Sequence, residues 1–285
     1  MQRLPEYLKR PIIDTEKTKT VRKILKDKCL NTVCDGARCP NKSECYSHNT
    51  ATFLIMGNVC TRNCKYCNIS SAKPLPLDKE EPKHIAEAIK ELKLKFAVIT
   101  SVTRDDLPDG GAEHFKNCIE EIRKLCNSKI EILTPDFGIN RIGTFPLDTI
   151  IKAHPDVFNH NIETVKRLFK TVRPQGSYDV SIEVLKYIKK NSDIITKSGL
   201  MVGLGETYDE IEETFADLKS AGVDIVTVGQ YIQPSKAHLE VCKYYTPEEF
   251  ETLKVIASKI GIKNYQISPL VRSSYKALQS WENVS

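Results

Sequence analysis

Short runs of apolar and β-branched residues alternate with longer amphipathic stretches along most of the chain. In the longer stretches the apolar residues recur at helical spacing, as at Ile85, Ile89 and Leu92. Strands that alternate with helices at intervals of about 30 residues are typical of βαβ units, whose strands pair in parallel. The runs that predict strands are 52–56, 96–100, 130–133, 157–159, 194–201 and 223–228.

Local signals mark where several of the helices begin and end. Pro82 falls where a first helical turn would begin, a position at which the backbone N–H needs no partner. Thr207 with Glu210 forms the sequence of a capping box, and Thr246 gives another start signal. Gly261 supplies a stop, because glycine readily adopts the left-handed conformation that ends many helices.

Six βα units are fewer than the eight that close a full barrel. We therefore expect an α/β fold with an open, partial (β/α)6 barrel over residues 50–260. Residues 1–49 form an expected N-terminal extension with a short helix around Val21, and residues 261–285 form a C-terminal extension. Parallel βα folds place their chemistry at the carboxyl ends of the strands. Residues that directly follow a strand are therefore the first candidates for a site.

Charge and hydropathy say little about partners. The 42 basic and 37 acidic residues give a net charge of +5 that is spread along the chain, and no apolar run is long enough to span a bilayer. Such a charge suits an acidic protein partner, but it is more typical of an ordinary solvated surface. No concentrated basic and aromatic face points to nucleic acid, and we expect neither a nucleic-acid nor a membrane partner.

The cysteines indicate the compartment. Ten cysteines cluster instead of being spaced through the 285 residues, which argues against a secreted disulfide framework and for a reducing environment. The first residues carry neither the apolar core of a signal peptide nor an amphipathic transit segment. We expect the protein in a cytoplasm.

Six of the cysteines fall into two triplets, and each triplet is one ligand short of a closed zinc site. A structural zinc ion is held by four protein ligands, whereas a cubane iron–sulfur cluster held by three thiolates keeps one iron open. Cys29 lies five residues before the first triplet and could shift its frame. The triplets are Cys34, Cys39 and Cys45, followed by Cys60, Cys64 and Cys67.

The second triplet resembles the defining motif of the radical S-adenosylmethionine (SAM) superfamily. Cys60, Cys64 and Cys67 are separated by three and two residues, and an aromatic residue, Tyr66, precedes the last cysteine. The resemblance implies a [4Fe-4S] cluster whose open iron chelates SAM. An electron from that cluster would cleave the sulfonium bond and generate a 5′-deoxyadenosyl radical. A partial barrel of the radical SAM type is the fold that the resemblance implies.

The first triplet resembles that of the lipoyl synthase family, which carries an auxiliary [4Fe-4S] cluster. Further segments look like that family in the family's order, among them 50–69, 101–114, 134–137, 159–165, 198–207, 229–235 and the RSSY motif at 272–275. The resemblance implies a sulfurtransferase that inserts two sulfur atoms, at C6 and C8 of a protein-bound octanoyl group, with the auxiliary cluster as sulfur donor.

The same resemblance assigns further site residues. The fourth ligand of the auxiliary cluster would be Ser274, with Ser273 as the lesser choice; a hard oxygen donor binds iron more weakly than a thiolate. The resemblance implies Gly110 and Gly111 for the SAM amino group, Asn161 and Glu163 for the ribose, and Arg173 for the carboxylate. Taken alone, the glycine pair is typical of a turn, Asn161 and Glu163 are equally typical of a helix cap, and Arg173 is equally typical of a surface ion pair.

The family also implies partners. These are octanoylated lipoyl carrier domains, namely E2 subunits of 2-oxoacid dehydrogenases and the glycine cleavage H protein. A reductant such as ferredoxin or flavodoxin and an iron–sulfur carrier for cluster repair would complete the set. Biotin synthases and methylthiotransferases would share the second triplet but do not suit the first triplet or the RSSY motif. A zinc ribbon would use four-ligand sites, and an electron carrier would need a far shorter chain.

Overall fold

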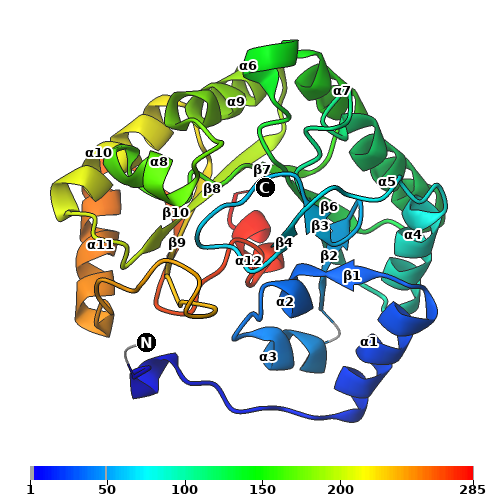
Figure 1. The fold of residues 1–285 in the computed structure, drawn as a ribbon, viewed down its shortest axis with the longest axis horizontal. Helices are drawn as coiled ribbons and strands as arrows, with labels where there is room; N and C mark the ends of the chain where they lie inside the picture. Colours follow the sequence, from blue (N-terminus) through cyan, green and yellow to red (C-terminus); the bar gives the residue numbers. More distant parts are fainter. Residues whose placement is uncertain (1–2, 49, 285) are drawn as a thin grey trace. The chain divides into compact units, whose positions relative to one another are not determined.

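A computed structural model of the protein describes residues 3–48 and 50–284 (Figure 1). The chain divides into two units that are not contiguous in sequence. The N-terminal unit comprises Arg10–Arg62 and Ile69–Asp156, and the C-terminal unit comprises Met1–Lys9, Asn63–Asn68 and Val157–Ser285. None of the described helices combines the length and apolar character needed to cross a bilayer.

In the N-terminal unit three strands pair in parallel, and their helices pack along one side of them (Figure 1). A short antiparallel strand, β1, adds to β2, while β3 and β4 form a separate two-stranded ribbon. The strands are β1 (Asn31–Thr32), β2 (Thr52–Ile55), β3 (Val59–Cys60), β4 (Ser70–Ser71), β5 (Phe96–Ser101) and β6 (Lys129–Leu133). The helices are α1 (Glu16–Asp27), α2 (Val33–Gly36), α3 (Lys42–Ser47), α4 (Glu81–Glu91), α5 (Ala112–Leu125), α6 (Ile139–Ile142) and α7 (Phe145–Ala153).

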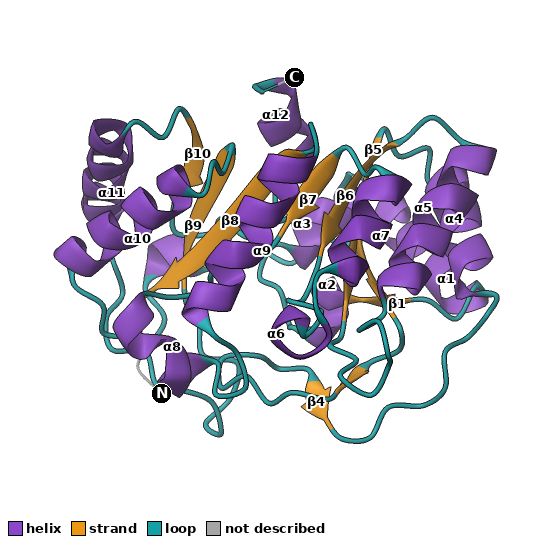
Figure 2. Cartoon of the chain, turned by 90° about the horizontal axis from the view of Figure 1, so that it is seen from above, coloured by secondary structure: helices purple, strands orange, loops and turns teal. Residues whose placement is uncertain are grey.

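The C-terminal unit repeats this construction with four parallel strands in the order β7, β8, β9, β10. Figure 2 shows β8, β9 and β10 side by side, with α10 and α11 along them. The strands are β7 (Val157–Asn159), β8 (Ile195–Val202), β9 (Ile225–Gln230) and β10 (Asn264–Ile267). The helices are η1 (Glu6–Leu8), η2 (Lys166–Leu168), α8 (Phe169–Val172), α9 (Tyr178–Asn191), α10 (Tyr208–Ser220), α11 (Pro247–Ile260) and α12 (Ala277–Glu282).

The strands read as apolar runs because both of their faces are covered. Every residue of β2 and of β9 is buried, as expected of parallel strands packed between helices and the interior. In the C-terminal unit, Val226 and Val228 of β9 belong to the same apolar cluster as Phe215 of α10 and Leu253 of α11. Each helix that follows a strand thus contributes the apolar residues of one of its faces to the core.

The α/β class and the parallel pairing predicted from the sequence are confirmed, and the six predicted strands correspond to β2, β5, β6, β7, β8 and β9. The pattern did not reveal β10, because its sequence NYQI is largely polar and only Ile267 is buried. The ribbon of β3 and β4 is also missed, since each of its strands has only two residues. The division at 49 and 260 stays a prediction.

The predicted helix signals are confirmed. Thr207 and Thr246 each accept a hydrogen bond from the backbone three residues on, and the glutamate there bonds back to the cap. Gly261 ends α11 with φ of 85°, in the left-handed region that favours glycine.

Thr246→Ala should lower the free energy of unfolding by about 1 kcal/mol, because it removes the side-chain cap of α11. Thr252→Ala is the matched control, since Thr252 is exposed inside the same helix. That change should be neutral or slightly stabilising, because alanine has the higher helix propensity. Urea unfolding followed by circular dichroism measures both, and equal effects would contradict a capping role for Thr246.

Candidate functional site

Cys60 is the last residue of β3 in the N-terminal unit, and two backbone N–H groups donate hydrogen bonds to its sulfur. Its Sγ accepts hydrogen bonds from the backbone N–H of Arg62 at 3.4 Å and of Thr103 at 3.3 Å. Thr103 follows β5 directly, and its carbonyl accepts from the N–H of Thr61 at 3.1 Å. The loop after β5 therefore holds the Cys60 sulfur in a fixed position.

A buried arginine anchors the chain directly after Cys60. Arg62 is 7% exposed and donates through Nε to Asp105 Oδ2 and through Nη1 to Asp136 Oδ2, both at 2.7 Å. Burial alone would raise the pKa of Asp105, but the hydrogen bond and charge of Arg62 hold it below its usual value. We call Arg62, Asp105 and Asp136 the arginine clamp. It ties the cysteine loop to the segments that follow β5 and β6.

Cys64 and Cys67 lie in the short segment 63–68 of the C-terminal unit. The Cys67 N–H donates to the Cys64 carbonyl at 3.1 Å, which closes a turn. The intervening Lys65 donates its N–H to Val172 O at 2.9 Å, and its carbonyl accepts from the N–H of Leu239 at 3.2 Å. Two distant loops of the same unit therefore hold the backbone of this turn.

His238 adds a side-chain contact to the same turn. Its Nε2 lies 3.0 Å from the Cys67 carbonyl, and its Nδ1 lies 2.8 Å from Ser235 Oγ. A carbonyl can only accept, so this network assigns the ring proton to Nε2, and Nδ1 then accepts from the serine. The contact of His238 to Cys67 spans 171 positions, so local sequence carries no signal for it.

Glu163 lies beside the turn that holds Cys64 and Cys67. Its φ is 69°, its N–H donates to Gly199 O at 2.9 Å, and its carbonyl accepts from the N–H of Met201 at 2.8 Å. Burial raises the pKa of Glu163, and the positive charge of Arg173 only partly offsets this. Burial likewise raises the pKa of Tyr66, to which the nearby carboxylate of Glu163 and the thiol of Cys64 contribute. The aromatic residue of the motif is thus in contact with the predicted SAM residues.

Asn161 and Arg173 also meet in the C-terminal unit. Arg173 is 8% exposed, donates through Nη1 to the Asn161 carbonyl at 3.1 Å and stacks over the Phe169 ring at 5.3 Å. Because the Arg173 guanidinium is buried in these contacts, Arg173 does not form the surface ion pair that the sequence allowed as an alternative. Asn161 caps none of the described helices; its amide contacts Ser273 instead. Ser274 follows in the same turn, which the Tyr275 N–H closes on Arg272 O at 2.9 Å.

Gly110 and Gly111 lie in the loop between β5 and α5 with φ of 62° and 94°. A Cβ on Gly110 would come within 2.9 Å of the Phe137 backbone, and one on Gly111 would come within 2.4 Å of Met56 Sδ. Conformation and space therefore both require glycine here. Packing within the N-terminal unit explains the pair by itself, and its predicted contact with the SAM amino group stays a prediction.

The first triplet lies entirely within the N-terminal unit. Cys34 is in α2, Cys45 is in α3, and Cys39 lies between them with its N–H donated to Cys34 O at 3.1 Å. Burial raises the pKa of Cys34 to about 12, and the neighbouring Cys39 adds to this. Burial also raises the pKa of Cys45 to about 12, with contributions from Cys34 and Cys39. The three thiols are close enough to influence one another, whereas Cys29 is exposed after α1.

A hydrogen-bonded triangle fixes the two helices of this triplet. Asp35 Oδ2 accepts from Thr32 Oγ1 and from the Tyr46 hydroxyl, both at 2.7 Å, and the two hydroxyls lie 3.0 Å apart. Tyr46 is 1% exposed. Asp35 directly follows Cys34, Tyr46 directly follows Cys45, and Thr32 lies two positions before Cys34. The triangle therefore sets the spacing of α2 and α3. No group of three cysteine, histidine or acidic side chains among the described residues is arranged for a single metal ion.

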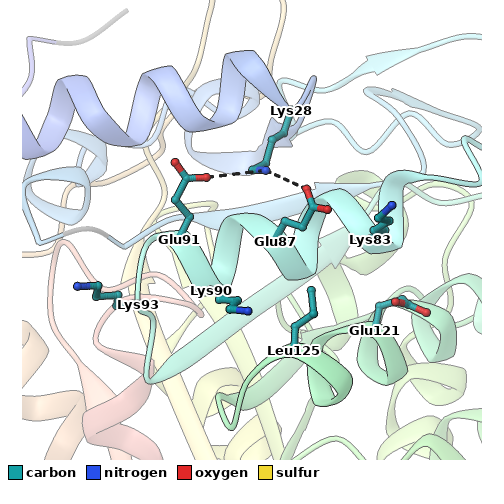
Figure 3. Close-up of a pocket in the computed structure, with 8 residues that line it drawn as sticks. All are labelled: Lys28, Lys83, Glu87, Lys90, Glu91, Lys93, Glu121 and Leu125. Carbon is teal, nitrogen blue, oxygen red and sulfur yellow. Dashed lines mark hydrogen bonds and ion pairs between the residues drawn. The ribbon is translucent and has the colours of Figure 1, made fainter.

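A charged hollow of about 620 Å³ lies between α1, α4 and α5 (Figure 3). Lysine and glutamate side chains line it and pair with one another, as Lys28 does with Glu87 at 2.9 Å and with Glu91 at 3.8 Å. It contains none of the cysteines. We assign no chemistry to it.

Comparison with known proteins agrees with these sites. Residues 54–218 match the model of the radical SAM superfamily. The chain is 49% identical over 276 residues to the lipoyl synthase of Caldanaerobacter subterraneus subsp. tengcongensis, covering 96% of each chain. It is 51% identical over 275 residues to the lipoyl synthase of Caldicellulosiruptor saccharolyticus, covering 96% of this chain and 95% of the relative.

Solved structures show the same fold at low identity. The hydrogenase maturase HydG from Carboxydothermus hydrogenoformans aligns over 95% of this chain and 69% of its own, with a TM-score of 0.60 and 13% identity. Streptococcus suis SuiB bound to S-adenosylmethionine aligns over 79% of this chain and 54% of its own, with a TM-score of 0.59 and 14% identity. The partial barrel of the radical SAM type predicted from the sequence is confirmed.

Arg62→Met should lower the free energy of unfolding by about 3 kcal/mol or more, because it leaves the carboxylates of Asp105 and Asp136 without their buried partner. Urea unfolding under anaerobic conditions measures the change.

Arg141→Met is the matched control, since Arg141 also pairs with Asp105, at 2.7 Å, but its side chain is 52% exposed. The loss there should not exceed about 1 kcal/mol. Equal losses in the two variants would show that the arginine clamp does not anchor the loop.

Proposed function

Because the chain belongs to the lipoyl synthase family of radical SAM enzymes, we propose that each of its two cysteine triplets holds a [4Fe-4S] cluster. The chain is a sulfurtransferase that uses SAM and a [4Fe-4S] cluster to insert sulfur at C6 and C8 of a protein-bound octanoyl group. The observation that carries the two-cluster proposal is a second set of three cysteines besides the radical SAM motif, which lie in α2, in α3 and in the turn between them.

The residues around Cys60, Cys64 and Cys67 fit a cluster with one open iron. Three thiolates leave that corner to SAM, and the cluster supplies the electron that cleaves the sulfonium bond. The two backbone N–H groups that donate to Cys60 Sγ hold this sulfur in place. The backbone bonds of Lys65 hold the turn that carries the other two ligands. Positioned donors of this kind reduce the movement needed when a cluster binds.

We assign Cys34, Cys39, Cys45 and Ser274 to the auxiliary cluster. Metal binding would displace the protons that burial keeps on the Cys34 and Cys45 thiols. Ser273 has its hydroxyl engaged with Asn161, whereas the Ser274 hydroxyl has no hydrogen-bond partner among the described residues. This supports Ser274 as the oxygen ligand. A serine oxygen binds iron less strongly than a thiolate, so its corner is the one from which sulfur would leave.

We assign the SAM contacts to five residues. A carboxylate and an amide side by side suit the two ribose hydroxyls, and the guanidinium beside them suits the SAM carboxylate. The partial burial of this group supports the assignment, because polar groups held away from water strengthen contacts to a ligand. The residues are Asn161, Glu163 and Arg173, with Gly110 and Gly111 for the amino group.

The enzyme acts on a protein-bound group, so its substrate is a carrier domain. We propose E2 subunits of 2-oxoacid dehydrogenases and the glycine cleavage H protein as carriers. Ferredoxin or flavodoxin would supply electrons, and an iron–sulfur carrier would rebuild the consumed cluster. We place these reactions in the cytoplasm, where the reducing environment suits ten cysteines that form no disulfide in the described structure.

Anaerobic reconstitution with iron and sulfide should give about eight irons per chain, since each cubane holds four. Cys34→Ser should reduce the count to about four. The matched control is Cys29→Ser, which should keep about eight irons because Cys29 is exposed and takes no part in the interaction among the three thiols. Iron is counted by colorimetric assay alongside the Mössbauer spectrum.

The reconstituted enzyme should convert an octanoyl-lysine peptide to its dithiolated product while forming 5′-deoxyadenosine from SAM. In Cys34→Ser, 5′-deoxyadenosine should still form but no sulfur should be transferred. About four irons in the unaltered protein, or sulfur transfer by Cys34→Ser, would contradict the two-cluster proposal.

Docking of an acidic carrier domain should weaken with salt, given the net charge of +5. We expect KM for the octanoylated carrier domain to rise severalfold between about 0.01 M and 0.15 M ionic strength, as the Debye length falls from about 30 Å to 8 Å. A neutral octanoyl peptide is the control and should show little change. Salt-insensitive kinetics with the carrier domain would count against electrostatic docking.

A further inference from the structure

The segment that carries the RSSY motif is bound along β9 of the C-terminal unit. The Ser268 N–H donates to Val228 O, and the Gln230 N–H donates to Pro269 O, both at 3.1 Å. The next residues form a turn with Ser273 and Ser274 at its two central positions. The backbone thus reaches the turn along a fixed path from β10.

Two glycines in the strands make room for this path. A Cβ on Gly229 of β9 would lie 2.1 Å from Val271 O. A Cβ on Gly199 of β8 would lie 3.0 Å from Asn161 Oδ1 and 3.2 Å from Ser273 Oγ. Both glycines are needed for space, because neither has a positive φ. The absent side chain of Gly229 leaves room for the backbone at Val271, and that of Gly199 leaves the volume in which Ser273 and Asn161 meet.

Ser273 contacts both ends of the Asn161 amide. Asn161 Nδ2 donates to Ser273 Oγ at 2.7 Å, and Ser273 Oγ lies 3.0 Å from Asn161 Oδ1, to which its hydroxyl can donate. A hydroxyl that accepts from the amide nitrogen and donates to the amide oxygen contacts the amide at both ends, so the Asn161 side chain is held in one position. The Asn161 backbone is fixed separately by Arg173, through its bond to the carbonyl.

We infer that Ser273 is a positioning residue that orients the Asn161 side chain for SAM. The two serines of the motif then have separate roles. Ser274 is the proposed ligand of the auxiliary cluster, and Ser273 acts on SAM binding through Asn161. The segment that completes the sulfur-donating site also shapes the site of the other reactant. This inference rests on the proposed function, in which Asn161 contacts the SAM ribose.

The size of the effect follows from the two contacts. Ser273→Ala frees the Asn161 amide to rotate, so that binding SAM must order it again. Net hydrogen-bond contributions of this kind correspond to about a fivefold to tenfold change in an equilibrium constant. SAM should still bind, because Asn161 itself is intact.

A double-mutant cycle on SAM affinity tests the inference. Equilibrium dialysis under anaerobic conditions measures Kd for the reconstituted enzyme and for Ser273→Ala, Asn161→Ala and the double variant. We expect Ser273→Ala to raise Kd about fivefold to tenfold and to have no further effect in the Asn161→Ala background. Ser273→Thr keeps the hydroxyl and should restore most of the affinity. Iron content should stay at about eight in all of them.

Ser192→Ala is the matched control, because it removes a serine hydroxyl of the same unit that bonds to Ile188 O at the end of α9. Its Kd for SAM should equal that of the unaltered enzyme. Additive effects of Ser273→Ala and Asn161→Ala, or an unchanged Kd in Ser273→Ala, would overturn the inference and leave the proposed function standing. Loss of iron in Ser273→Ala would also overturn it, since Ser273 would then be the cluster ligand. Failure of Asn161→Ala to weaken SAM binding would reject the proposed ribose contact, and with it the inference.

Discussion

A cluster that keeps one iron open is held by only three protein ligands, so the protein must fix those ligands more firmly than a closed site requires. The structure meets this constraint with hydrogen bonds placed around the cysteines. Cys60 receives two backbone N–H groups, and the arginine clamp holds the chain that follows it. The first triplet, for which a fourth ligand is proposed, is supported in another way: a triangle of Thr32, Asp35 and Tyr46 sets its two short helices. The rest of the fold supplies the strand ends from which these contacts come.

The fold could be predicted from the sequence wherever burial leaves a pattern. Strands covered on both faces, such as β2 and β9, are continuous apolar runs, and the helix caps at Thr207 and Thr246 depend on residues three positions apart. Strand β10 has no such pattern, because it lies at the end of the strand order in its unit and buries one residue. Its pairing is decided by the backbone of β9.

For the site, the sequence identified the cysteines but not the groups that hold them. Ligand spacing is local, whereas the supporting contacts join distant positions: Arg62 and Asp136 are 74 residues apart, and Asn161 and Ser273 are 112 apart. Charged or polar residues such as Arg62 and His238 have no local feature that separates them from an ordinary loop residue. Only the folded chain shows that Arg62 ties the cysteine loop to Asp105 and that His238 contacts Cys67.

The long separation between the radical SAM turn and the loop that holds it has a consequence for how the enzyme matures. Cys67 emerges from the ribosome 171 residues before His238. At translation rates of about 5–20 residues per second, that interval lasts roughly 9 to 34 s. Throughout it, two thiols of the motif are on a nascent chain without the backbone support from Leu239. The backbone support of this turn is therefore complete only at a late stage of synthesis, and its two thiols reach their folded geometry only then.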